Sequence, residues 1–264
     1  MRHELRRGVI HRAYAEDIYP RLEPGSVSLL ISDGPYGMSK AGWDRMKPRD
    51  LPEWYAPHIE AWGRVCAPSA TVYVWGTDEG EGYLREPMRA AGWTFRGSVV
   101  WHKTGAHPAL IGGTFADVTE RAGLWTRGDG DIVGGASVWA LAPTSMDGRL
   151  WADDLVPHRV TGVLQRVGLH PCQKPLAFYD RMIRASSRPG DLVLEPFGGT
   201  CRAAVAIERM PEPDARRYVC VESDEDGRDY LAAVLRSLRT DPDTSTELQP
   251  SLFTNHQPAH QEAP

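Results

Sequence analysis

The sequence lacks any pattern of cysteines that would bind a metal or form a disulfide framework. Its 264 residues contain four cysteines, which stand singly at positions 66, 172, 201 and 220 with no C-x-x-C pair. Scattered single cysteines argue against a structural zinc site and fit a protein of a reducing cytoplasm. We therefore expect no metal and a cytoplasmic location.

Long apolar runs and an excess of basic charge are missing too. No stretch approaches the roughly 20 apolar residues that cross a bilayer. The charged start, residues 1–7, has no apolar core after it, so we expect neither a membrane span nor a signal peptide. The 30 Lys and Arg residues are outnumbered by 35 Asp and Glu, and the net charge is −5. A nucleic-acid partner would therefore have to meet a local basic surface.

The stretch from Val27 to Gly37 is the centre of the chain. Its apolar run predicts a buried parallel strand that ends before Gly34 and delivers Asp33 and Tyr36 to the carboxyl edge of the sheet. Ligands of open α/β sheets bind at that edge. These groups suit a planar base that carries an exocyclic amine. Hydrogen bonds from the amine N–H groups to the Asp33 carboxylate and the Gly34 carbonyl would favour a pyramidal nitrogen with a free lone pair. Tyr36 would stack on a base turned out of the duplex. A plain turn is the alternative, because Asp, Gly and Pro are common in turns.

The second half of the chain has the order of an adenosine-binding unit. Residues 192–222 predict a strand, a Gly198-Gly199 turn, a helix and a second strand that ends at Glu222. Glycines allow close approach of a ligand to the backbone, and an acid at the end of the next strand can accept both ribose hydroxyl hydrogens. The turn reads Phe-Gly-Gly-Thr-Cys-Arg and does not match the dinucleotide pattern G-x-G-x-x-G.

The remaining segments alternate between strand and helix, which indicates a mostly parallel sheet. Residues 38–52 form a polar, basic loop after the catalytic turn. Residues 127–169 lose clear periodicity, and we interpret them as a recognition insertion, with a decorated surface loop as the alternative. Further expected strands are 70–75, 95–101 and 118–125, and the expected helices are 54–62, 79–91 (interrupted at Pro87), 176–185, 203–210 and 226–238.

Three ordered motifs resemble those of β-class DNA amino-methyltransferases, which methylate adenine N6 or cytosine N4. Asp33-Gly-Pro-Tyr36 is similar to their Asp-Pro-Pro-Tyr motif, and Glu195-Pro-Phe-Gly-Gly199 to their Asp-Pro-Phe-x-Gly motif for S-adenosylmethionine. Between them, His170-Pro-Cys-Gln-Lys174-Pro175 is similar to a His-Pro-x-x-Lys-Pro segment. The resemblance covers about residues 8–236. The sequence departs from the family pattern at four places: Gly34 replaces a proline, Glu195 replaces an aspartate, Cys201 stands where a second glycine is usual, and Ala13-Tyr14 stands where Gly-Asp is expected.

The resemblance implies a circularly permuted Rossmann-like fold in the α/β class. Its sheet would have seven strands, mostly parallel with one antiparallel, and helices on both faces. The implied division is a catalytic half in 1–126, the recognition insertion in 127–169, an S-adenosylmethionine-binding half in 170–238 and a disordered tail in 239–264.

The resemblance also implies the site and its partners. The catalytic residues would be Asp33, Gly34, Pro35 and Tyr36. The cofactor-binding residues would be His170, Lys174, Pro175, Glu195, Pro196, Phe197, Gly198, Gly199, Thr200 and Glu222. Candidates for contacts with double-stranded DNA are Lys40, Arg45, Lys47, Arg149 and Arg159.

Several functions remain open at this stage. Asp at position 33 favours adenine N6 over cytosine N4, because the cytosine-N4 members more often carry Ser. The same chemistry on RNA or on a protein glutamine amide is a second hypothesis. A non-catalytic DNA-binding relative is a third. A homodimer and a restriction endonuclease partner are compatible with the sequence, which does not specify the recognition site.

Overall fold

The computed structural model describes residues 1–39, 42, 44–102, 119–128, 138–139, 174 and 176–223, together with 231, 232, 234, 235 and 238. Most of the predicted recognition insertion and the whole of the predicted tail lie outside these residues. The same holds for five predicted site residues, Lys40, Arg149, Arg159, His170 and Pro175. Within the described ranges, no helix has the length and apolarity needed to span a membrane.

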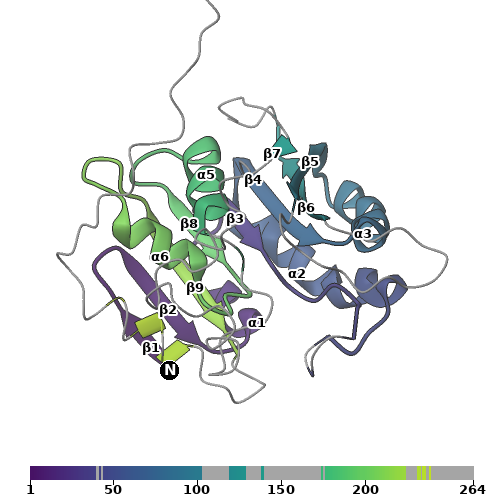
Figure 1. The fold of residues 1–264 in the computed structure, drawn as a ribbon, viewed down its shortest axis with the longest axis horizontal. Helices are drawn as coiled ribbons and strands as arrows, with labels where there is room; N and C mark the ends of the chain where they lie inside the picture. The colour runs from purple at the N-terminus through teal and green to yellow at the C-terminus, as the bar shows by residue number, and fades with distance from the viewer. Residues whose placement is uncertain are drawn as a thin grey trace, which may run out of the picture.

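A single mixed sheet forms the middle of the molecule (Figure 1). Its strands lie in the order β1-β2-β9-β8-β3-β4-β6-β5-β7. β6 runs antiparallel to both of its neighbours, and β1 runs antiparallel to β2; the other pairs are parallel. The bounds are Arg2–Glu4 (β1), Gly8–Arg12 (β2), Val27–Ser32 (β3), Cys66–Gly76 (β4), Thr94–His102 (β5), Thr119–Thr126 (β6), Val138–Trp139 (β7), Leu192–Glu195 (β8) and Arg217–Glu222 (β9).

The sequence predicts seven strands, one of them antiparallel. This prediction holds for the seven central strands of the sheet, which lie in the spatial order β2-β9-β8-β3-β4-β6-β5. It is wrong for the sheet as a whole, which has nine strands in the described residues, two of them antiparallel. The additional strands are β1, with three residues, and β7, with two. Strands this short at a sheet edge show no hydrophobic alternation, so the pattern could not reveal them.

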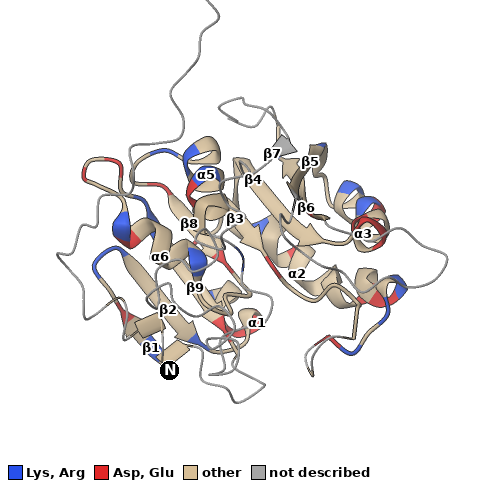
Figure 2. Ribbon diagram, viewed as in Figure 1, with Lys and Arg blue, Asp and Glu red and all other residues tan. Residues whose placement is uncertain are grey.

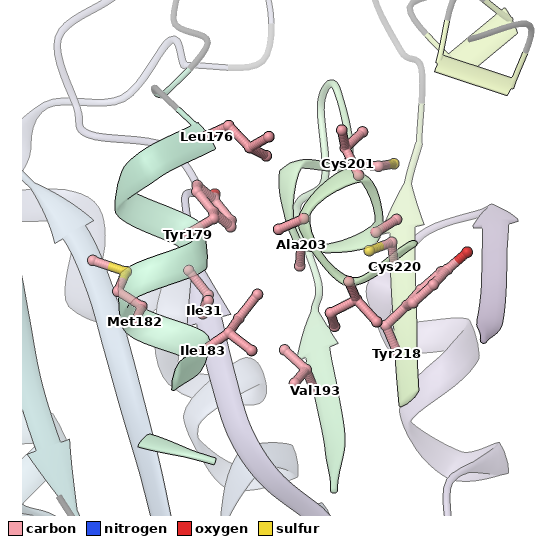
Figure 3. Packing of buried hydrophobic residues seen from close by; sticks show 14 of the residues in the cluster. Ile31, Leu176, Tyr179, Met182, Ile183, Val193, Cys201, Ala203, Tyr218 and Cys220 are labelled. Atoms are coloured by element: carbon pink, nitrogen blue, oxygen red, sulfur yellow. The ribbon is translucent and has the colours of Figure 1, made fainter. Parts of the chain in front are cut away.

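Helices cover both faces of the sheet, as predicted. α5 (Leu176–Ser186) and α6 (Arg202–Arg209) lie on one face, and α1 (Ala15–Ile18), α2 (Leu51–Val65) and α3 (Asp78–Ala90) on the other. The alternation of β3 explains the two cores: Leu29 and Ile31 belong to the core with α5 and α6, whereas Leu30 packs with α2. Figure 3 shows Ile31 beside α5 and Val193 of β8 beneath α6.

Helix α3 continues through Pro87, where we had predicted an interruption. Proline has no N–H to donate within a helix and usually ends or kinks it. Here the following residue, Met88, is 1% exposed and anchors the last turn in the core. Tertiary packing therefore outweighs the local preference.

The topology gathers several strand ends at one edge of the sheet. β3, β4, β8 and β9 run parallel, so their carboxyl ends share that edge. The antiparallel strand β6 begins there, which brings Glu120 to the same place.

Lys and Arg are interspersed with Asp and Glu along α3, α5 and α6 (Figure 2).

Candidate active site

The turn with the predicted catalytic residues 33–36, called the catalytic turn for that prediction, follows β3 directly. Asp33 is partly buried, and the Tyr36 hydroxyl donates to its Oδ1 at 2.6 Å. Gly34 is buried and leaves no room for a side chain: a Cβ there would lie 2.6 Å from Tyr55 Oη and 2.9 Å from Phe197 Cδ2. The glycine at this position is therefore matched to its neighbours, because the Tyr55 hydroxyl fills the space that a larger residue would need.

The ammonium group of Lys174 contacts the carboxylate of Asp33. Its Nζ is 2.9 Å from both oxygens of Asp33 and 3.2 Å from Glu120 Oε2. The ammonium also faces the ring of Tyr36 at 5.1 Å and that of Trp75 at 5.4 Å. We had predicted Lys174 in the cofactor pocket, and the structure places its ammonium at the catalytic turn.

The segment after the turn is folded back by a buried carboxylate. Asp44, 2% exposed, accepts hydrogen bonds from the N–H groups of Gly37 at 2.6 Å and Met38 at 3.0 Å. Two of the predicted DNA contacts, Arg45 and Lys47, follow Asp44 and are exposed. The basic loop is thus tied to the catalytic turn.

The glycine turn after β8 packs closely against the end of β9. The Gly199 N–H donates to Glu222 Oε2 at 2.5 Å, which joins the turn to the end of β9. A Cβ on Gly198 would lie 3.0 Å from the Cys201 sulfur and 3.1 Å from the Val221 carbonyl oxygen. Backbone therefore lines this turn, and Glu222 remains partly exposed beside it.

Glu195 lies behind the glycine turn. It is fully buried and accepts from the Ala203 N–H and from the Cys220 thiol, both at 3.0 Å. Burial raises the pKa of Glu195 to about 7. The sequence predicts Glu195 among the cofactor-binding residues; in the structure its hydrogen bond to the Ala203 N–H connects the turn to the start of α6. Pro196 and Thr200 are buried beside it.

Phe197 connects the glycine turn to the catalytic turn. It contacts Gly34, as described above, and packs against Trp54 at 5.2 Å and His58 at 4.9 Å between ring centroids. Both aromatic partners belong to α2. Because β3 and β8 are adjacent and parallel, the two predicted motifs meet at this contact.

Comparison with known proteins agrees with this arrangement. Residues 138–232 match the family model described as DNA methylase, N6_N4_Mtase. The sequence is 24% identical over 241 residues to the type II methyltransferase M2.DpnII of Streptococcus pneumoniae, covering 85% of this chain and 87% of that protein. The family model and this relative both make the chain similar to the N6-adenine and N4-cytosine DNA methyltransferases.

A second relative and two solved structures have similar coverage. The type II methyltransferase M2.LlaDCHI of Lactococcus lactis subsp. cremoris is 23% identical over 252 residues, covering 89% of this chain and 91% of that protein. The cytosine-N4-specific PvuII DNA methyltransferase has a TM-score of 0.66 at 13% identity, over 87% of this chain and 86% of that one. The M1.HpyAVI–SAM complex has a TM-score of 0.58 at 18% identity, over 87% and 98%. These two structures support the fold.

Three residues of the candidate site were not among the sequence predictions: Tyr55, Asp44 and Glu120. Tyr55 packs on Gly34, Asp44 ties the loop and Glu120 contacts Lys174. The departure at Gly34 is a sequence signal from which a compensating neighbour could have been inferred, but the sequence analysis does not name one. Glu120 lies at the site because β6 runs antiparallel to β4, which the local sequence pattern does not indicate.

Proposed function

We propose that this methyltransferase transfers a methyl group from S-adenosylmethionine to the exocyclic amine of a base flipped out of double-stranded DNA. Adenine N6 is the leading target and cytosine N4 the alternative. The observation that carries the proposal is the contact between the two motifs. Asp33 and the glycine turn stand at the ends of neighbouring parallel strands, and Gly34 touches Phe197. A methyl acceptor and a methyl donor held by these turns would therefore lie side by side.

The residues of the glycine turn fit S-adenosylmethionine, the cofactor of the family. Gly198 has no room for a Cβ beside Cys201 and Val221, so backbone lines this turn, and Glu222 has a partly exposed carboxylate suited to ribose hydroxyls. Phe197 would contribute an apolar wall. When bound, the cofactor supplies an activated methyl group on a sulfonium, which becomes a thioether as the methyl is transferred.

Asp33 and Gly34 would prepare the amine. The nitrogen lone pair of adenine or cytosine is delocalised into the ring, so the free base is a poor nucleophile. Hydrogen bonds from the amine to the Asp33 carboxylate and the Gly34 carbonyl would favour a pyramidal nitrogen and orient its lone pair. The nitrogen loses one proton on methylation, and Asp33 would accept that proton. Tyr36 would stack on the flipped base.

The basic segment after the catalytic turn supports a polynucleotide substrate. Arg45 and Lys47 are exposed on a loop that Asp44 anchors beside the site, where they could meet phosphates. The carboxylate at position 33 supports adenine as the leading target. The relatives named type II methyltransferases support a restriction endonuclease partner.

Product identification tests this function. The purified protein is incubated with S-adenosylmethionine and unmethylated genomic DNA, and the digested nucleosides are analysed by mass spectrometry. We expect N6-methyldeoxyadenosine; N4-methyldeoxycytidine would keep the class and change the base. No methylated product from DNA, with methyl transfer to RNA or to protein amides under the same conditions, would overturn the DNA proposal. Cofactor binding without transfer to any of them would indicate an inactive relative.

A further inference from the structure

Lys174 is held between two carboxylates at the edge of the sheet. Its side chain is 1% exposed, and those of Asp33 and Glu120 are 16% and 17% exposed. The three groups come from different parts of the chain: the end of β3, the start of β6 and the residue before Pro175. One cation thus faces two anions at a site with little access to water.

The Lys174 ammonium donates hydrogen bonds to the Asp33 oxygens that would accept the target amine in the proposed reaction. Lys174 Nζ is 2.9 Å from Oδ1 and from Oδ2 of Asp33, and the Tyr36 hydroxyl donates to Oδ1 as well. A carboxylate accepts through about four lone-pair positions. An incoming amine would therefore compete with Lys174 for the same acceptor. Charge-assisted bonds of this kind are stronger than those from a neutral amine.

Glu120 offers Lys174 a second anion. Its Oε2 is 3.2 Å from Nζ, so the ammonium needs only a small movement to lean toward Glu120 and release an oxygen of Asp33. Charge balance favours this movement, because the buried ammonium keeps a carboxylate partner throughout. An ion pair between Lys174 and Asp33 alone would have no such alternative.

We propose that Lys174 is a positioning residue for methyl transfer: it orients Asp33 before the base enters and shifts onto Glu120 when the target amine takes its place. The inference rests on the proposed function, and it assigns Glu120 the role of receiving the ammonium. Lys174 and Glu120 would act through Asp33, which alone of the three touches the substrate.

Substitution of Glu120 gives the direct test. Glu120→Gln keeps the size and polarity of the side chain and removes the second anion, so Lys174 should stay on Asp33. We expect the single-turnover methylation rate at saturating DNA and cofactor to fall about tenfold, which corresponds to about 1.4 kcal/mol of barrier. Glu86→Gln, an exposed site on α3, is the matched control for loss of one negative charge and should keep the wild-type rate.

The double variant separates this role from a merely structural one. In Glu120→Gln/Lys174→Met the ammonium no longer covers Asp33, so the rate should rise above that of Glu120→Gln alone. A structural role predicts a double variant no faster than the single one. That result, or a Glu120→Gln enzyme with the wild-type rate, would overturn the inference while the wild type still methylates DNA. A wild type that methylates no DNA would overturn the proposed function, and this inference with it.

Discussion

At the residue scale, the glycine of the catalytic motif is explained by its neighbours. A Cβ at Gly34 would lie 2.6 Å from Tyr55 Oη, and Tyr55 is fully buried. Gly34→Ala should therefore destabilise the protein by about 1–3 kcal/mol, as overpacking in a core does. The measurement is the thermal unfolding midpoint.

A compensating substitution tests that explanation. Tyr55→Phe removes the hydroxyl, so the double variant Gly34→Ala/Tyr55→Phe should recover part of the loss. Recovery would stay incomplete, because the new Cβ still lies 2.9 Å from Phe197 Cδ2. If Tyr55→Phe adds its own loss without rescue, the clash with the hydroxyl is not the cause.

Glu195 should make stability depend on pH. Burial raises its pKa to about 7, so the folded protein binds a proton that the unfolded chain releases near its ordinary value of 4.5. Stability is then favoured at low pH and falls as the pH rises from about 4.5 to about 7. Glu195→Gln removes this titration and can still accept from the Ala203 N–H. We expect its thermal midpoint to gain on that of the wild type between pH 5 and pH 8; a constant difference would contradict the assignment.

At the scale of the element, α3 offers a matched pair of glycines. Gly82 is exposed in this helix, and a Cβ built there meets nothing within 4 Å. Gly82→Ala should raise stability by about 0.5–1 kcal/mol, because glycine loses more backbone freedom in a helix than alanine does. The thermal midpoint should rise by roughly 1–4 °C.

The second glycine of the pair is the control. Gly80 lies in the first turn of α3, where a Cβ would come within 3.0 Å of Leu51 Cδ1 and 3.3 Å of Thr77 Oγ1. Thr77 is the N-cap and accepts from the Gly80 N–H at 3.1 Å. Gly80→Ala should therefore gain less than Gly82→Ala. Equal gains at the two positions would show that packing against the cap has no effect.

At the scale of the whole molecule, hydrophobic periodicity predicted the central strands, whereas the sheet topology determines which of their residues come together. Strand β3, the glycine turn and Glu222 were predictable, because apolar runs that end in turn residues are local signals. Neighbouring parallel strands then brought Gly34 close to Phe197. The short edge strands β1 and β7 carry no such signal.

Long-range contacts in the site were beyond local patterns. The ammonium of Lys174 and the carboxylate of Glu120 meet because β6 runs antiparallel beside β4, which a run of residues does not reveal. The burial of Glu195 likewise depends on α6 and β9 closing over it. Motif resemblance located Lys174 and Glu195 in the chain, but it did not indicate Glu120 or the other residues that they contact.

The central claim is that Asp33 accepts the target amine during methyl transfer to DNA. Asp33→Asn keeps the size of the side chain and removes its charge. We predict that methyl transfer to DNA, counted as methylated deoxynucleosides by mass spectrometry, falls about 10²-fold or more, while S-adenosylmethionine binding by calorimetry changes little. An Asp33→Asn enzyme that methylates DNA at nearly the wild-type rate would contradict the account.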